Sequence, residues 1–188
     1  MRQSLNDKEI REILFDYFES TGKKLRFFEE LNIGNSRADA VLVMDDTLIG
    51  FEIKSDVDSL KRLPEQIKNY TKYCNQNYLV IGTYFLDKVQ DILPETWGIY
   101  SCTQTETACK LVCIRKAKPN QKVKLSNQLS LLWRNELIHI VKKYKLGGVT
   151  KRNRKKLAEL TIEKLEESVV MHELCEELME REYRESGM

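Results

Sequence analysis

Three side chains in the first third of the chain have the types and spacing of a site that could bind a cation and activate water. Asp39 begins one apolar segment, and Glu52 and Lys54 lie two residues apart in the next. Because side chains alternate across a β-strand, Glu52 and Lys54 share one face, while Phe51 and Ile53 point the other way. Antiparallel pairing of the segments brings Asp39 near Glu52, and a hard cation such as Mg²⁺ resolves the repulsion between the carboxylates. Lys54 could then orient an attacking water and neutralise charge on a phosphate.

A following helix adds three polar groups on one side. Arg62, Gln66 and Tyr70 follow each other at intervals of four residues, which places them on one helix face. A guanidinium, an amide and a phenol in such a row can all contact phosphate oxygens. Each feature also has a structural interpretation: an exposed charged strand, a turn cap or a chance spacing. Their order on two strands and a helix favours the chemical interpretation.

Apolar spacing and turn residues predict the elements that position these groups. A helix should start after Asn6 or Asp7, and a second should lie within 58–73, beginning near Leu63 because Pro64 fits only a first turn or a kink. Short turns predict an antiparallel meander. Its three strands are expected at 25–33, 38–44 and 48–55. We further expect a central strand at 77–85, a helix at 86–92, strands at 97–101 and 110–115, and helices at 125–144, 152–165 and 168–183.

This order of motifs resembles the PD-(D/E)XK nuclease superfamily. More narrowly, it is similar to a group of small, largely uncharacterised bacterial and phage-associated members. The resemblance covers most of the chain and is strongest from 37 to 98. It implies an α/β fold with a restriction-endonuclease-like mixed sheet flanked by helices, and an α-helical C-terminal extension. The residues that carry it are Arg37-Ala38-Asp39, Gly50 to Asp56, Arg62-Leu63-Pro64, Gln66, Tyr70, Pro94, Trp97-Gly98 and Leu131 to Leu137.

The resemblance also implies a role for each matching residue. Asp39, Glu52 and the main-chain carbonyl of Ile53 would hold Mg²⁺, for which Mn²⁺ can substitute. Lys54 would be the catalytic lysine. Gln66 resembles the supporting glutamine that RecB-type members carry on this helix.

The sequence departs from the superfamily pattern at one position and leaves another undecided. The residue before Asp39 is Ala38, where the pattern has a proline that varies widely in the superfamily. Many members also place an acid on the first helix. Asp7 on that helix and Glu30 late in the first strand are both candidates, and the sequence does not choose between them.

Charge is distributed unevenly, although the formal net charge is only +2. Residues 1–113 contain 14 basic and 18 acidic residues, residues 114–156 contain 14 basic and one acidic, and residues 157–188 contain 3 basic and 10 acidic. A strongly basic zone favours a polyanion, because each neutralised phosphate releases counterions. The alternative is a solvated surface whose cations pair with the acidic tail.

One basic run within this zone is a candidate nucleic-acid contact. It begins a predicted helix, where cations oppose the helix dipole, so a phosphate backbone is one reason for their presence. A salt-bridged helix start is the alternative. The residues are Lys151, Arg152, Arg154, Lys155 and Lys156.

Composition excludes several protein classes. The chain has 188 residues, of which 41% are apolar and 32% charged, as in globular proteins. No apolar run reaches the roughly 18–20 residues of a membrane span, and we see no signal peptide. Five cysteines without a Cys-x-x-Cys pair argue against a disulfide scaffold or zinc ribbon. We therefore expect a cytoplasmic protein with a nuclease core at 1–116 and a helical extension at 117–188.

These observations predict one function and keep one alternative. We expect a Mg²⁺-dependent nuclease that hydrolyses phosphodiester bonds, with DNA as the expected substrate, although no residue decides between DNA and RNA. No motif for reading base edges is present, so we expect no sequence specificity. The alternative is a nuclease fold that binds DNA or a protein without turnover. Apolar residues of the last helices should pack on the chain's own core or on a second copy, giving a homodimer.

Overall fold

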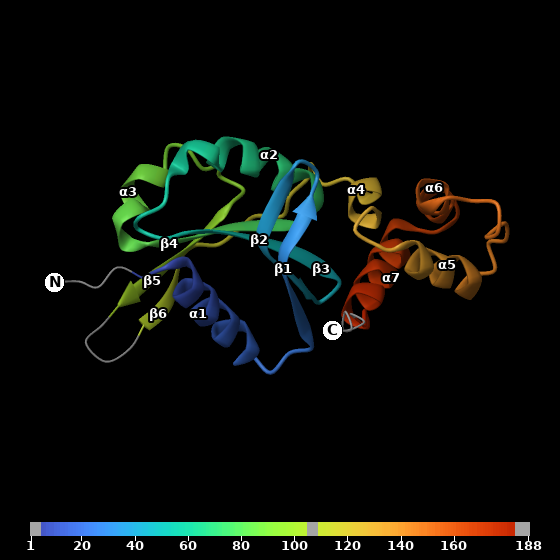
Figure 1. Ribbon diagram of the computed structural model, residues 1–188, viewed down its shortest axis with the longest axis horizontal. Coiled ribbons are helices and arrows are strands. Elements are labelled where there is room, and N and C mark those ends of the chain that lie inside the picture. Colours follow the sequence, from blue (N-terminus) through green and yellow to red (C-terminus); the bar gives the residue numbers. More distant parts are fainter. Residues whose placement is uncertain (1–4, 105–108, 183–188) are drawn as a thin grey trace, which may run out of the picture. The chain divides into compact units, whose positions relative to one another are not determined.

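A six-stranded mixed β-sheet organises the first of two compact units, Met1–Val123 and Lys124–Met188, in a computed structural model of the chain. The structure describes residues 5–104 and 109–182. The sheet order is β1-β2-β3-β4-β5-β6, with β3, β4 and β5 parallel and the other neighbours antiparallel (Figure 1). The strands are β1 (Leu25–Ile33), β2 (Ser36–Met44), β3 (Thr47–Lys54), β4 (Gln76–Gly82), β5 (Gly98–Gln104) and β6 (Cys109–Arg115).

The first three strands form the predicted antiparallel meander. The turn between β2 and β3 consists of Asp45 and Asp46, which both have positive φ angles of 51° and 54°. Two central residues with positive φ match the right-handed twist of a hairpin. This tight turn fixes the register of β2 against β3, which pairs Ala40 with Phe51 at its far end.

Helices cover both faces of the sheet (Figure 1). On one face, α1 (Asp7–Glu19) begins at a capping box formed by Asn6 and Glu9 and buries Ile10, Leu14 and Phe18 in the same core as Phe51 and Ile53. On the other face lies α2 (Leu63–Tyr73), preceded by the 3₁₀ turn η1 (Leu60–Arg62). As predicted, α2 begins at Leu63 with Pro64 in its first turn, where a missing N–H costs nothing.

The central strand is shorter than predicted. β4 ends at Gly82, and the chain continues as the 3₁₀ turn η2 (Thr83–Phe85) and the short helix α3 (Leu86–Val89). Gly82 packs directly against Asp56, because a Cβ atom at Gly82 would lie 2.0 Å from Asp56 Oδ1. The same oxygen accepts a hydrogen bond from the Tyr84 N–H at 3.3 Å. At Tyr84 the backbone N–H therefore bonds to a side chain and not to a neighbouring strand, and the chain leaves the sheet here.

The second unit contains only helices among its described residues: α4 (Leu125–Leu129), α5 (Arg134–Lys143), α6 (Arg154–Lys164) and α7 (Glu167–Met179). The single helix predicted at 125–144 is wrong, because the chain breaks before α5. Glu136 accepts a hydrogen bond from the Trp133 N–H at 2.6 Å, and Arg181 binds both oxygens of that carboxylate at 2.6 and 2.7 Å. Residue 183, the predicted end of the last helix, lies outside the described residues. Within the described ranges, no helix has the length and apolar composition needed to cross a bilayer.

Candidate active site

The structure brings Asp39, Glu52 and Lys54 together on the sheet face that α2 covers. Ala40 pairs with Phe51, so Asp39 and Glu52 are the next opposite positions of the two strands. Glu52 is fully buried and Lys54 is 6% exposed, and the Lys54 ammonium forms an ion pair with Glu52 Oε1. The alternation expected from the sequence is present, because Phe51 and Ile53 belong to the core on the opposite face.

Asp39 is held at a point where β2 and β3 part. Its backbone N–H donates to the Tyr70 hydroxyl at 3.0 Å, and that hydroxyl donates to the Phe51 carbonyl at 2.8 Å. The phenol therefore links the backbones of the two strands. The Asp39 carboxylate bridges the same gap, with Oδ2 accepting from the Ile53 N–H at 2.7 Å. Two elements thus fix this carboxylate relative to Glu52.

Strand β1, on the other side of β2, is irregular opposite Asp39. The β1–β2 register runs from Glu29–Ala40 to Leu31–Ala38, so Glu30 lies opposite Asp39. Glu30 has φ +54°, in the left-handed region that costs a non-glycine residue about 1–2 kcal/mol. Such strain persists only where the surrounding structure imposes it, and it is concentrated at functional sites.

Burial and mutual repulsion govern the ionisation of the two acids. Burial, followed by the negative charge of Asp39, raises the pKa of Glu52 to about 7, although Lys54 opposes this shift. Burial also raises the pKa of Asp39, against the hydrogen bond from the Ile53 backbone and the charge of Lys54. Near neutral pH Glu52 is therefore poised to gain or lose a proton, a property typical of functional carboxylates.

A cavity of about 430 Å³ opens beside this cluster. Ile53, whose side chain is buried in the core on the opposite face, contributes to the wall. The other residues of the predicted site that line it are Asp7, Glu30, Asp39, Lys54, Arg62 and Gln66. Sequence reasoning gave no site role to the further lining residues Arg11, Asn35, Ser36, Arg37, Asp58 and Glu65.

Arg11 connects both candidate additional acids. Its guanidinium contacts Asp7 Oδ2 at 2.9 Å, Glu30 Oε1 at 3.2 Å and Glu29 Oε2 at 2.8 Å. Arg37 forms a further ion pair with Glu30. Asp7 and Glu30 thus both lie at the cavity, and both are paired with Arg11. The Asp7–Arg11 spacing of four residues in an expected helix is the signal that could have identified Arg11.

The three predicted groups of the α2 region have different surroundings. Arg62 is exposed at the cavity, and Gln66 Oε1 is buried beside it without a hydrogen-bond partner. Tyr70 is 0% exposed and its hydroxyl binds β2 and β3, so its predicted contact with a phosphate is wrong. The phenol sits so deep because Gly50 leaves room for it: a Cβ atom at Gly50 would lie 2.6 Å from the Tyr70 ring.

The donor set fits a hard cation that keeps several waters. Glu52 Oε2 is buried without a hydrogen-bond partner, which is costly for a carboxylate oxygen unless something else binds it. Asp39 uses one oxygen on Ile53 and retains the other. Among the described residues, no group of three or more His, Cys, Asp or Glu side chains is arranged to hold a metal. Two carboxylates, a main-chain carbonyl and water suit Mg²⁺, which rarely uses an all-protein cage.

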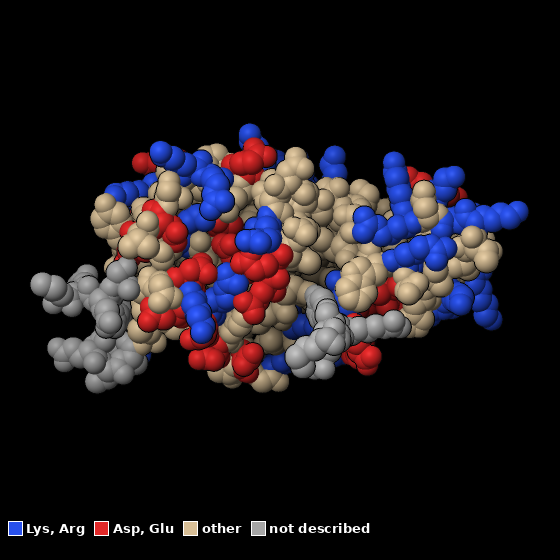
Figure 2. Space-filling view, viewed as in Figure 1, with Lys and Arg blue, Asp and Glu red and all other residues tan. Residues whose placement is uncertain are grey.

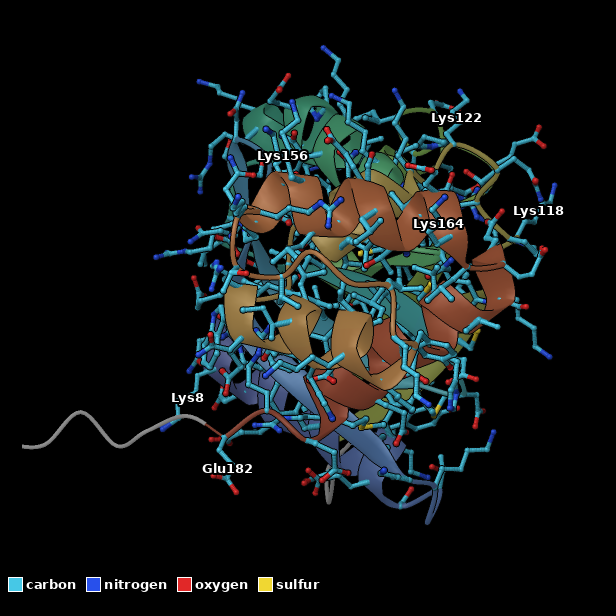
Figure 3. The ribbon with its side chains drawn as sticks, turned by 90° about the vertical axis from the view of Figure 1, so that its right-hand side faces the viewer. Lys8, Lys118, Lys122, Lys156, Lys164 and Glu182 are labelled. Atoms are coloured by element: carbon cyan, nitrogen blue, oxygen red, sulfur yellow. The ribbon has the colours of Figure 1, made fainter. Side chains whose placement is uncertain are left out.

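The predicted basic run belongs to the second unit. Lys151 and Arg154 are exposed, as are Lys155 and Lys156, while Arg152 is partly buried and donates to the Gly147 carbonyl at 3.0 Å. Asn153 caps α6 by accepting the Lys156 N–H at 3.0 Å. Lys and Arg side chains gather over α5 and α6 (Figure 2), and Lys156 and Lys164 project from α6 (Figure 3).

Comparisons with known proteins identify the family of the chain and a protein of similar structure. The family described as "Bacteriophage P4 protein cII" matches residues 1–188. Protein cII of Enterobacteria phage P4 is 24% identical over 156 residues, which cover 81% of this chain and 58% of that protein, so the chain spans little more than half of this relative. The SPO1766 protein of unknown function from Silicibacter pomeroyi is similar in structure, with a TM-score of 0.51 and 13% identity over 80% of this chain and 100% of that one. SfsA of Pyrococcus furiosus in complex with Ca²⁺ gives a TM-score of 0.36 and 16% identity over 63% and 62% of the two chains.

Proposed function

The chain belongs to the bacteriophage P4 protein cII family, and we propose that it is a metal-dependent nuclease of the PD-(D/E)XK type with a restriction-endonuclease-like core. The substrate we propose is DNA. One observation carries the proposal: Glu52, an almost buried Lys54 and Asp39 converge beside a cavity, with a buried oxygen of Glu52 left without a partner. A protein that only binds nucleic acid gains nothing from carboxylates placed near a phosphate.

Each side chain of the proposed site has a separate role in phosphodiester hydrolysis. Asp39, Glu52 and the Ile53 carbonyl would hold Mg²⁺ or Mn²⁺, which when bound would supply Lewis-acid stabilisation of the phosphate. Lys54 orients the attacking water and balances the negative charge that develops on the phosphate oxygens. The free Oε1 of Gln66 accepts a hydrogen bond from that water.

Cations at two places hold the nucleic acid. Arg62 lies at the cavity and contacts the phosphate next to the cleaved bond. The basic residues at the start of α6 bind the backbone without reading sequence. The substrate is therefore defined by its charge and structure.

Non-catalytic DNA binding remains the second candidate function, because the basic residues of the helical unit would serve it equally well. Purified protein and covalently closed circular DNA, with Mg²⁺, Mn²⁺ or EDTA, separate the two. Nicked or linear products only with metal support the nuclease. A mobility shift without cleavage supports the binding module.

The Lys54→Ala variant assigns cleavage to this site. It should abolish cutting and leave the mobility shift unchanged, because Lys54 acts on the reacting phosphate and contributes little to affinity. Lys61→Ala removes an exposed lysine seven residues later and serves as the matched control, which should cut at the wild-type rate. Metal-dependent cutting by Lys54→Ala would falsify the assignment.

A further inference from the structure

An exposed aromatic side chain stands at the sheet edge where the proposed catalytic strand ends. Tyr84, in η2 directly after β4, is 60% exposed, and Val57, in the loop after β3, is 82% exposed. Among the large apolar side chains that the structure describes, these two are the most exposed. Figure 1 shows α3, which follows η2, beyond the end of β4. Tyr84 lies outside the cavity lining, so its exposed ring is available to a part of a ligand that extends beyond the cavity.

Backbone contacts tie Tyr84 to the residues after Lys54. β3 and β4 run parallel with Lys54 opposite Ile81, so both strands deliver their next residues to one edge. Asp56, two residues after Lys54, accepts the Tyr84 N–H at 3.3 Å, and Gly82 lies against the same carboxylate. Tyr84 thus lies at the same end of the sheet as Lys54, the proposed catalytic lysine.

Neighbouring side chains fix the orientation of the ring and add charge. The Lys88 ammonium lies 3.6 Å from the centre of the Tyr84 ring, a cation–π contact. Phe85 meets the same ring edge-on, with centroids 5.2 Å apart and an angle of 70° between the planes. Phe85 is buried and anchors the turn, whereas Lys88 is exposed. Surfaces that bind single-stranded nucleic acid combine these two features, an aromatic ring for base stacking and a cation for the backbone.

We propose that Tyr84 and Lys88 form a subsite in which an unpaired nucleobase stacks on the face of the tyrosine ring that Lys88 does not cover, while the ammonium contacts the adjacent phosphate. The inference rests on the proposed function and specifies its substrate, a nucleic acid with a single-stranded or frayed segment beside the cut. Bases in an intact duplex already stack on each other and offer no free face, so the subsite selects unpaired strands. The adjacent cation favours a polyanion over an apolar protein surface.

Base stacking can be measured without cleavage, in EDTA. The probes are duplexes with a single-stranded overhang that carries 2-aminopurine at successive positions, because stacking on an aromatic ring quenches its fluorescence. Wild-type protein should quench at one or two positions only. Tyr84→Phe keeps the ring and should preserve the quench. Tyr84→Ala should abolish it and weaken overhang binding about 10-fold, the order expected for one stacked base.

Two further variants make the result specific. Tyr17→Ala removes another exposed tyrosine, which lies on α1, and should leave both quench and affinity at wild-type values. Lys88→Gln should preserve the quench and reduce the salt dependence of binding by about one counterion. Equal quench and affinity for wild type and Tyr84→Ala would overturn the subsite, as would equal affinity of wild type for the overhang and for a blunt duplex. Metal-dependent cutting of closed circular DNA is scored separately, so the subsite and the nuclease proposal can fail independently.

Discussion

At the scale of single residues, the buried Glu52 governs the charge of the proposed site. Its carboxylate is fully buried, one oxygen binds Lys54, and the other has no partner. Burial and the Asp39 charge together raise the pKa of Glu52 to about 7, so near neutral pH a substantial fraction is protonated. A cation would favour the charged form, and metal binding should therefore release protons.

The raised pKa makes stability depend on pH. The folded-state pKa of Glu52 lies above its usual value of 4.5, so its contribution to stability is full below pH 4.5 and is lost as pH rises through 7. Glu52→Gln mimics the protonated side chain at every pH. The free energy of unfolding of this variant, relative to wild type, should rise by about 3 kcal/mol from pH 4.5 to pH 8. Urea unfolding in EDTA at a series of pH values measures the difference.

A control variant shows whether the pH dependence of the free energy of unfolding comes from the buried Glu52 or from the loss of any carboxylate. Glu65→Gln removes an exposed acid that lines the cavity. A difference between Glu52→Gln and wild type that stays constant with pH would show that Glu52 ionises normally in the folded protein.

At the scale of elements, α2 sets the spacing of the two strands that carry the acids. The Tyr70 hydroxyl accepts from the Asp39 N–H and donates to the Phe51 carbonyl, and Gly50 gives its ring the space to do so. The helix therefore positions Asp39 relative to Glu52 without reaching the cavity through this phenol. Tyr70 is therefore a positioning residue.

Tyr70→Phe tests that role, because it keeps the ring and removes both hydrogen bonds. We expect a loss of about 1–3 kcal/mol in stability, from two buried backbone groups left without a partner. Hydrogen exchange at the Asp39 amide should accelerate more than at other β2 amides, and the concentration of Mg²⁺ needed for cleavage should increase. Tyr73→Phe, three residues later on α2, is the matched control. An unchanged exchange rate at Asp39 in Tyr70→Phe would rule out the positioning role.

The sequence predicted the elements better than it predicted their contacts. Alternating apolar residues and turn residues located the meander, and Pro64 located the start of α2. The break before α5 was missed because its cause is remote: Arg181 holds the Glu136 carboxylate that caps Trp133. Helical spacing likewise placed Tyr70 beside Gln66, but the hollow above Gly50, which buries the phenol, exists only once strand and helix meet. The local sequence pattern predicts the type of element and the face on which a side chain lies. How deeply that side chain is buried depends on packing between elements that are distant in the sequence.

At the scale of the whole molecule, the two units distribute their charges differently. Met1–Val123 has 18 basic and 18 acidic residues, whereas Lys124–Met188 has 10 basic residues and one acidic residue in 124–156, followed by 3 basic and 10 acidic residues in 157–188. The sheet unit contains the acids and the cavity, whereas the basic residues from 124 to 156 belong to the helical unit. We expect the helical unit to supply most of the salt-dependent affinity for nucleic acid and the sheet unit to supply turnover.

Neutralising the start of α6 tests this division. Exchange of Lys151, Arg154 and Lys156 for Gln should weaken DNA binding and reduce the slope of log affinity against log salt by up to about 0.9 for each phosphate that is no longer neutralised. Fluorescence anisotropy with a labelled duplex over a range of salt concentrations measures both quantities. Cleavage at saturating protein should continue, because the catalytic groups are untouched.

The matching control removes three cations that already have acidic partners. Lys23 lies 2.5 Å from Asp45, Lys118 lies 3.3 Å from Glu95, and Lys8 lies 3.8 Å from Glu12. Exchange of these three lysines for Gln changes the net charge equally. An equal reduction of affinity in both triple variants would mean that net charge, and not the start of α6, attracts the nucleic acid.

Anomalous diffraction from crystals soaked in Mn²⁺, with wild-type protein and the Asp39→Asn variant, tests directly whether Asp39 and Glu52 bind a metal ion. We expect an anomalous peak in contact with the carboxylates of Asp39 and Glu52 in wild type, and a greatly reduced peak in the variant. Manganese bound only at other places, or an undiminished peak in Asp39→Asn, would contradict a metal-dependent catalytic centre at these residues.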